Sequence, residues 1–304
     1  MNAACDLCGS IASRHLFTKK GWRLEACDGC GLVRVEPMPS AEQVAQMYSL
    51  AAGYQLARLR GPTRYTRWET ARSERLASIT GAATRPGARL LDVGCSTGDY
   101  LDRARARGWA AQGIEPAKHL AAFARIKRGL PVEHAAVADV LPRFGTESFT
   151  VITLWDVIEH LPNPLEAMRD LYRALEPGGS LYLATPNLSG WVPRFHWRIV
   201  RPLSGAWPHP EPPLHLHQFT AATIARLLAA AGFEQVRFLP DEIPLWYTSG
   251  FRGQPQARQW LRGEPEARGA RAIYLTTLPV FLAARWFGRG DSMIVRGLRV
   301  DPRG

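Results

Sequence analysis

The chain has 304 residues, 46% of them hydrophobic, so it can bury one sizeable α/β core and a small accessory module. It lacks both the run of about eighteen apolar residues that a membrane span needs and the apolar core of a signal peptide, so a cytoplasmic protein is expected. The net charge of +11 suits nucleic acid, an anionic membrane surface or a phosphorylated substrate, and residues 251–304 contribute +6 of it through ten arginines against four acids.

Four of the five cysteines form two Cys-x-x-Cys pairs near the N-terminus: Cys5 with Cys8, and Cys27 with Cys30. Eighteen residues separate the pairs, and a glycine follows each of them. This spacing is typical of two knuckles that supply four thiolates to one tetrahedral Zn²⁺, whereas four unligated buried cysteines are the alternative. We therefore expect a zinc ribbon at 1–39. Its closed four-sulfur site leaves no coordination position open, so a structural role is predicted.

A helical linker or cap is expected at 40–80. Ser40, followed by Gln43, has the pattern of a helix start, and the helix should run to about residue 79. The aromatic residues of this segment either cap an active site or simply pack, and they are Tyr48, Tyr54, Tyr65 and Trp68.

The main domain begins with a strand that leads into a glycine-containing turn. Residues 89–93 are apolar, the turn 94–98 reads GCSTG, and a helix is expected at 99–107. Such a unit is the nucleotide-binding start of a doubly wound sheet, in which Gly94 and Gly98 let the backbone approach a ligand. A second strand, 111–115, ends in Glu115, which stands where an acid hydrogen-bonds two ribose hydroxyls. Asp99 replaces the third glycine of the dinucleotide fingerprint, which disfavours NAD.

Segment 91–98 (LDVGCSTG) resembles motif I of class I S-adenosylmethionine (SAM) dependent methyltransferases. Segments 149–164 and 175–187 are similar to the fourth and fifth strands of that family, and the whole resemblance covers about 89–239. It implies an α/β fold with a doubly wound, mostly parallel seven-stranded Rossmann-like sheet at 81–304 behind the small ribbon. It also implies SAM as the cofactor. The residues expected to line the SAM site are Asp92, Gly94, Cys95, Gly98, Glu115, Asp139, Val140 and Trp155.

A ribbon followed by a Pro-x-Pro segment is also similar to a subgroup of these enzymes that act on sugars and other bacterial secondary metabolites. That resemblance implies methylation of an oxygen or a carbon on a small molecule or a glycan-like acceptor. A nucleotide-linked or lipid-linked sugar is the acceptor class that it suggests first.

Methyl transfer to a hydroxyl or an acidic carbon requires that a proton leave the acceptor, and histidine suits this role near neutral pH. His160 ends the segment that follows the fourth strand. In some related O-methyltransferases a similar cluster binds a divalent metal, so Asp156, Glu159 and His160 are a candidate metal group. The alternative is that Glu159 and His160 cap the next helix and shape the pocket.

Two further histidines, His215 and His217, precede a helix expected at 221–231. Sugar C-methyltransferases of the zinc-ribbon subgroup resemble this chain in having a Glu-His pair before a similar helix start. His215 aligns with that histidine, while Leu214 stands in place of the glutamate. His215 is therefore the first choice as general base, and His217 is either a second candidate or a neighbour without chemistry.

The C-terminal part is expected to supply strand six at 233–239 and strand seven at 291–298, with strand seven antiparallel beside strand six. Between them lies an insertion at 245–290. Its segment 273–287 is apolar, carries arginines at its flanks and ends in Trp286 and Phe287. Three roles are open for 272–287: contact with an anionic bilayer at the inner face of the membrane, a lid, or a dimer contact.

Two other functions compete with small-molecule methylation: an RNA-modifying or nucleic-acid-binding protein, and a SAM-binding fold without catalysis. Between Cys8 and Cys27 the basic residues lack the aromatic interleaving expected of a single-strand binder. The turn after the fourth strand, Trp155-Asp156-Val157-Ile158, also lacks the Asn/Asp-Pro-Pro-aromatic tetrad of many base N-methyltransferases. Nucleic acid is therefore disfavoured as a partner.

Overall fold

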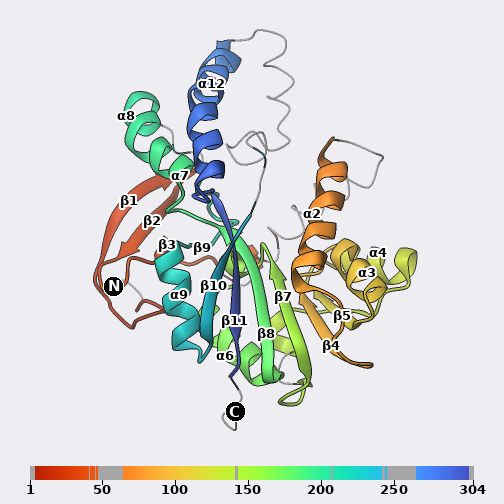
Figure 1. Ribbon diagram of the computed structural model, residues 1–304. Coiled ribbons are helices and arrows are strands. Elements are labelled where there is room, and N and C mark those ends of the chain that lie inside the picture. The colour runs from red at the N-terminus through yellow and green to blue at the C-terminus, as the bar shows by residue number, and fades with distance from the viewer. Residues whose placement is uncertain are drawn as a thin grey trace. The chain divides into compact units, whose positions relative to one another are not determined.

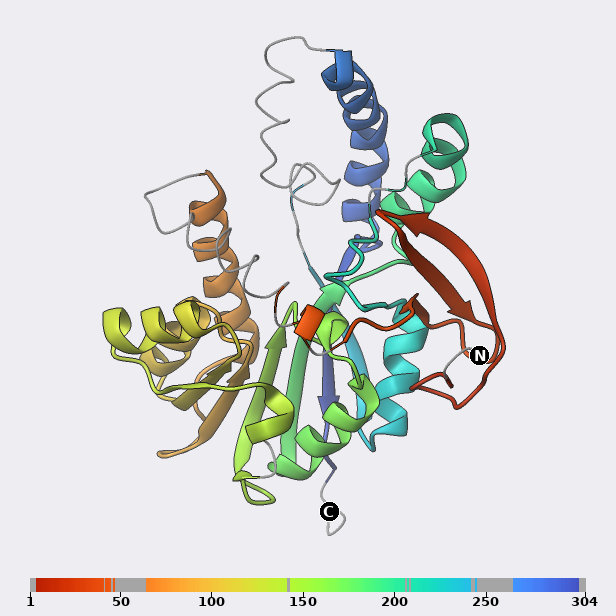
Figure 2. The same ribbon diagram turned by 180° about the vertical axis from the view of Figure 1, so that it is seen from behind.

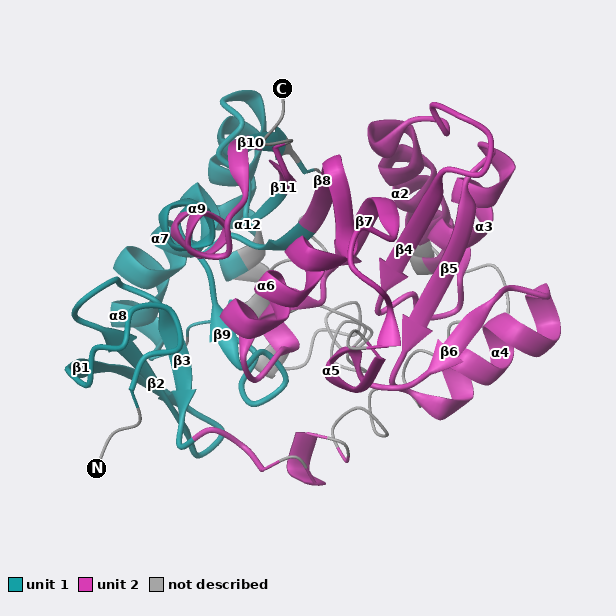
Figure 3. Ribbon diagram, turned by 90° about the horizontal axis from the view of Figure 1, so that it is seen from below, with its two compact units in different colours: residues 1–37, 184–225, 238–294 teal, residues 38–183, 226–237, 295–304 magenta. Residues whose placement is uncertain are grey.

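The computed structural model (Figures 1 and 2) describes residues 4–40, 42–44, 46, 64–140, 143–205, 207, 209–241, 244 and 265–300. The chain forms two compact units, shown in different colours in Figure 3. Unit 1 comprises 1–37, 184–225 and 238–294, and unit 2 comprises 38–183, 226–237 and 295–304.

A seven-stranded sheet has the strand order β10-β11-β8-β7-β4-β5-β6. Strand β4 pairs in parallel with β5 and with β7, and β5 pairs in parallel with β6. The strands span β4 Arg89–Val93, β5 Ala110–Glu115, β6 Val132–His134, β7 Phe149–Trp155, β8 Leu175–Pro186, β10 Glu234–Pro240 and β11 Ser292–Leu298. Central strands β4 and β7 are runs of apolar residues buried on both faces, as in a doubly wound sheet. The predicted fold class is confirmed, and β11 lies beside β10 as expected.

Helices alternate with the strands of unit 2: α2 Arg64–Thr80, α3 Asp99–Ala106, α4 Lys118–Arg128, α5 Val137–Val140 and α6 Pro164–Ala174. Helix α6 buries Pro164, Met168 and Leu171, whose spacing of four and three residues forms one apolar stripe. Helix α2 packs against α3. A short 3-10 helix, η3 Ile158–His160, follows β7, and α9 spans Ala221–Ala230.

The predicted helix start at Ser40 is confirmed by a reciprocal pair of bonds. The Ser40 N–H donates to Gln43 Oε1 over 2.9 Å, and the Gln43 N–H donates to Ser40 Oγ over 3.2 Å. Trp68 of α2 is half-buried and stacks with Arg72. Tyr48, Tyr54 and the side chain of Tyr65 lie outside the described residues.

Unit 1 holds a four-stranded antiparallel sheet with the order β1-β2-β3-β9. Its strands are β1 Ser13–Lys19, β2 Trp22–Cys27, β3 Val33–Glu36 and β9 His217–Gln218. The first three come from the predicted ribbon, whereas β9 arrives from far along the chain. Trp207 packs against Leu24 of β2 and Val35 of β3 in the apolar core beside this sheet.

The helices of unit 1 are α7 Trp191–Phe195, the π-helix η4 His196–Val200, α8 Arg201–Ser204 and α12 Pro265–Trp286. Helix α12 packs against α7. Among the described residues no helix is both long enough and apolar enough to cross a bilayer.

Candidate functional site

The loop between β4 and α3 depends on its two glycines. Gly94 and Gly98 have φ of +70° and +81°, a region that side-chain-bearing residues rarely adopt. A Cβ on Gly94 would lie 2.5 Å from Val157 Cγ2, and one on Gly98 would lie 2.4 Å from Leu130 Cδ1. The glycines are therefore needed for close packing of the loop on its own unit.

Glu115 ends β5 and is 5% exposed. Its Oε2 accepts the Ser96 N–H and its Oε1 accepts the Ala117 N–H, each over 2.8 Å. Burial raises the pKa of Glu115, while these two bonds oppose the shift. Each carboxylate oxygen keeps a second lone pair, so the residue can accept two more hydrogen bonds from a ligand such as a ribose diol.

Asp92 is a second carboxyl group, fully buried in β4. The Thr153 hydroxyl donates to its Oδ1 over 2.7 Å. Burial raises the pKa of Asp92 to about 8 against the Thr153 bond, and the neighbouring Glu115 charge adds to the rise. Two buried carboxyl groups close to each other favour a cationic ligand, because a positive charge would stabilise their ionised forms.

The other residues predicted for the SAM site differ in what they present. A Cβ on Gly113 would lie 2.5 Å from Cys95 Sγ, so the thiol packs on β5, and the Cys95 N–H donates to the Ile114 carbonyl over 3.0 Å. Trp155 packs edge-on against Tyr100, and its indole N–H has no hydrogen-bond partner among the described residues. In α5, Val140 is buried and Asp139 is exposed.

At the end of β7, Asp156 does not join Glu159 and His160 in the predicted metal-binding group. Arg72 of α2 binds the Asp156 carboxylate over 2.5 and 3.3 Å. Among the described residues Asp156 forms no metal-ligating group with Glu159 and His160. Glu159 is 1% exposed, and its Oε1 lies 4.0 Å from His160 Nε2. Sequence reasoning missed Arg72, because its partner is 84 residues away and no local pattern marks the pair.

The four cysteines of unit 1 converge. Their sulfur atoms all lie within 4.8 Å of one another, with Cys5 and Cys30 at 3.6 Å and Cys8 and Cys27 at 3.5 Å. Tetrahedral Zn–S bonds of about 2.3 Å would place sulfurs about 3.8 Å apart, so the cluster has nearly the required dimensions. Both knuckles close through the same bond, from the glycine after each pair to the carbonyl of its first cysteine, over 2.8 Å.

His217 and His215 also lie in unit 1. His217 is fully buried in β9, and its Nε2 lies 3.2 Å from Oδ2 of Asp6, the residue that follows Cys5. It therefore supports the cysteine knuckle from the edge of the ribbon sheet. His215 is also buried, and its backbone N–H donates to the Glu211 carbonyl over 3.0 Å. Asp6 was not predicted, since its partner lies 211 residues away.

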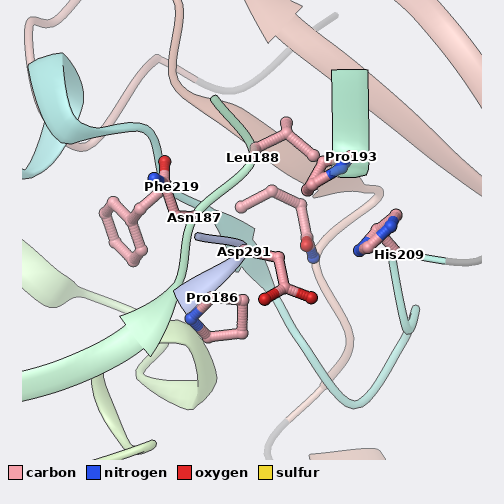
Figure 4. Close-up of a pocket in the computed structure, with 8 residues that line it drawn as sticks. Pro186, Asn187, Leu188, Pro193, His209, Phe219 and Asp291 are labelled. Atoms are coloured by element: carbon pink, nitrogen blue, oxygen red, sulfur yellow. The ribbon is translucent and has the colours of Figure 1, made fainter. Parts of the chain in front are cut away.

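A small cavity of about 10 Å³ lies in unit 1 beside the end of β8, with Asn187, His209 and Asp291 on its wall (Figure 4). The Asn187 amide donates to the Gly290 carbonyl over 3.1 Å, so it holds two chain segments together. Pockets for drug-sized ligands measure about 300 to 1,000 Å³, so this one is too small for a sugar-sized acceptor.

Residues 64–237 match the family model described as "Methyltransferase domain". A ubiquinone biosynthesis O-methyltransferase of Pseudomonas putida (strain GB-1) is 32% identical over 113 residues, which cover 36% of this chain and 49% of that protein. One from Pseudomonas fluorescens (strain SBW25) is 31% identical over 105 residues, covering 33% and 45%. The chain thus spans about half the length of the curated relatives that it matches.

Two solved structures share the fold. The [4+2]-cyclase SpnF has a TM-score of 0.57 at 22% identity, covering 87% of this chain and 98% of that one. A SAM-dependent methyltransferase from Archaeoglobus fulgidus has a TM-score of 0.52 at 16% identity, covering 76% and 93%. At these identities the likeness concerns the fold alone.

The residues of unit 2 fit SAM. Glu115 has lone pairs for two ribose hydroxyls, Trp155 has a buried donor with no partner in the described part of the chain, and Asp92 adds a carboxyl group for a cation. These features match a ligand with a diol, a heteroaromatic base and a sulfonium charge.

Proposed function

The chain belongs to the methyltransferase domain family, and from this premise we propose that it is a SAM-dependent methyltransferase that methylates an oxygen of a hydroxylated small molecule. The names of the two reported relatives, both O-methyltransferases, support oxygen as the accepting atom. The expected acceptors include sugars carried by a nucleotide or a lipid.

The observation that carries the proposal is the bonding of Glu115. Both of its oxygens are held by backbone N–H groups of the loops that follow β4 and β5, so the carboxylate is oriented before a ligand arrives. Bound SAM would supply an electrophilic methyl group on a sulfonium centre. A preorganised carboxylate spends no free energy on reorientation when the ribose binds, which favours one alignment of that methyl group.

For the acceptor proton we propose His160, which lies at the carboxyl end of β7, where ligands of such sheets bind. The buried Glu159 carboxylate beside it would stabilise the imidazolium that forms once His160 has taken the proton. Glu159 is thus a positioning residue. His215, the first choice from the sequence, remains the second candidate for the base.

We further propose that Cys5, Cys8, Cys27 and Cys30 bind one structural Zn²⁺. The separations between the four sulfur atoms support this assignment. The backbone N–H groups of Cys30 and Gly29 also support it, because they donate hydrogen bonds to the Cys27 sulfur. Burial alone would raise the pKa of Cys27, but these bonds and the Cys8 thiol lower it to about 7. Donors aimed at a sulfur stabilise the thiolate that zinc requires.

The experiment measures methyl transfer from radiolabelled SAM to a panel of hydroxylated aromatic compounds and sugars, with the parent protein and with His160→Ala and His215→Ala. A general base contributes about 10² to 10⁴ in rate, so the variant that lacks it should lose that factor in kcat and keep the parent affinity for SAM.

Full turnover by His160→Ala together with loss in His215→Ala would move the base to His215. Transfer to carbon or nitrogen acceptors alone would contradict the proposed chemistry. SAM binding without turnover on any acceptor would instead favour the non-catalytic alternative.

A further inference from the structure

Helix α12 has a defined inner face. Thr277 is fully buried, its hydroxyl donates to the Ile273 carbonyl over 2.6 Å, and His196 Nε2 lies 2.7 Å from the same oxygen. Burial lowers the pKa of His196 to about 4, so its ring is neutral near pH 7 and donates through Nε2. Ala284, two turns further along the helix, is 1% exposed. These contacts tie one side of α12 to η4.

The opposite side of α12 is apolar and exposed. Leu275 and Leu282 are 55% and 56% exposed, Trp286 is 87% exposed, and Pro279 is exposed between them. At about 100° per residue these four positions fall within about 60° of one another and about 180° from Thr277. Because Thr277 is held by His196, this apolar stripe cannot turn inward without breaking a buried bond.

A second apolar surface lies close by on η4 and α8. Ile199 is 49% exposed and Leu203 is 84% exposed, four residues apart on one side of the continuous helical segment. Helix α12 packs on α7, which continues into η4 and α8, so one chain of packed helices connects the two apolar surfaces. Figure 3 shows α7 between α8 and α12. Phe287, 64% exposed, extends the surface at the end of α12.

The charge of these two segments has one sign. Residues 191–205 and 273–290 together contain five arginines and no acidic residue. Four of the arginines are exposed: Arg194, Arg198, Arg285 and Arg289. This surface combines exposed leucine, tryptophan and phenylalanine with arginines and carries no acidic residue. It is therefore complementary to a lipid bilayer, in which an apolar layer lies beneath negatively charged headgroups.

We propose that the docking surface formed by Ile199, Leu203, Leu275, Leu282 and Trp286 binds the surface of an anionic lipid bilayer. The apolar side chains would enter the boundary between headgroups and acyl chains, while the arginines would contact lipid phosphates and add electrostatic attraction. Such contact lies in the plane of the interface and needs no membrane-spanning helix. The proposal is independent of which acceptor is methylated.

The test is sedimentation of the 304-residue chain with vesicles of phosphatidylcholine containing about one third phosphatidylglycerol, and with vesicles of phosphatidylcholine alone. The parent should bind the anionic vesicles at least tenfold more tightly, and 0.5 M salt should weaken that binding. Leu282→Asp should reduce the binding at least tenfold. The matched control is Ile126→Asp on α4, an exposed isoleucine in unit 2, which should bind as the parent does.

A second variant, Arg198→Gln with Arg289→Gln, keeps the apolar residues and should lose most of the preference for anionic vesicles. Equal binding by Leu282→Asp and the parent, or no binding of the parent to anionic vesicles, would overturn the proposal. So would light scattering that shows a dimer which Leu282→Asp dissociates, because the surface would then join two copies of the chain.

Discussion

Asp92 and Glu115 show what single residues contribute to this site. Both carboxyl groups are buried in unit 2, and burial raises the pKa of each. Two buried carboxylates that are both ionised lower the stability of the folded protein, because they are desolvated and repel each other. Such pairs are found at ligand sites, where a ligand of opposite charge offsets the loss. The two residues therefore link protein stability, SAM binding and pH.

Asp92→Asn should make the protein without SAM more stable at neutral and alkaline pH. A folded-state pKa of about 8 against a reference of 3.8 means that the folded protein keeps a proton which the unfolded chain has lost. This contribution to stability is full below about pH 4 and is lost as the pH rises through about 8. The amide stays neutral throughout and keeps an acceptor for Thr153. Thermal unfolding at pH 4 and pH 8 measures the difference.

At pH 4 the two proteins provide their own control, since Asp92 is then protonated and any remaining difference reports the amide itself. An Asn variant whose advantage does not grow with pH would show that Asp92 titrates in its ordinary range.

The parent's affinity for SAM should rise with pH, because a cation binds better to ionised Asp92. The gain is up to about tenfold per pH unit below the pKa of Asp92. Calorimetry from pH 6 to 8 should show this rise, with proton release, and Asp92→Asn should bind SAM about tenfold or more weakly at pH 8. Parallel curves for the two proteins would remove Asp92 from the SAM site.

At the scale of elements, the ribbon of unit 1 is completed by β9. Val33 pairs with Gln218 and Arg34 with His217, so a two-residue strand closes a sheet whose other strands precede it by about 180 residues. His217 joins this strand to Asp6 within the first knuckle. The contact with Asp6 gives the buried His217 a structural role, so no catalytic role is needed to explain its position.

Purified protein should contain about one zinc per chain, and Cys27→Ser should lose it, since three thiolates bind far more weakly than a closed set of four. His217→Ala should keep the zinc under mild conditions but release it to a chelator about 10- to 100-fold more readily, as expected for loss of a residue behind the ligands. Metal analysis and the rate of release to a coloured chelator measure both. A metal-free parent protein would contradict the zinc assignment.

At the scale of the whole chain, unit 1 is assembled from three separate stretches, and its core depends on the first of them. Leu24, Val35 and Trp207 are all at most 4% exposed and lie in one apolar cluster. Residues 184–225 thus contribute β9 and Trp207 to a core that cannot form without residues 1–37.

A fragment of residues 38–304 should therefore lose the cooperative folding of unit 1. Each large apolar side chain left exposed costs about 1.5 to 3 kcal/mol, and the β9 edge loses its partner strand. Denaturant unfolding followed by tryptophan fluorescence should show a lower midpoint, and light scattering should show aggregation. Unfolding like that of the parent would mean that the ribbon sheet is dispensable.

Local patterns determined much of this protein. The apolar run 89–93 marked β4 with the observed bounds, and the resemblance of segment 149–164 to a family strand contained β7. The Gly94 to Gly98 turn was found from its glycines, and the paired cysteines predicted a cluster that the fold brings together. In each case the deciding interaction lies within a few residues or follows from a spacing that the chemistry itself requires, so sequence alone was sufficient.

Tertiary structure decided the rest. It paired Asp156 with Arg72, Asp6 with His217 and β9 with β3, and it turned the Cys95 thiol onto Gly113. A carboxylate, an imidazole or a short strand could pair with many chemically equivalent groups or strands along the 304 residues. Which one it meets depends on the packing of distant elements, whose free energy is shared among many weak contacts and leaves no local mark in the sequence.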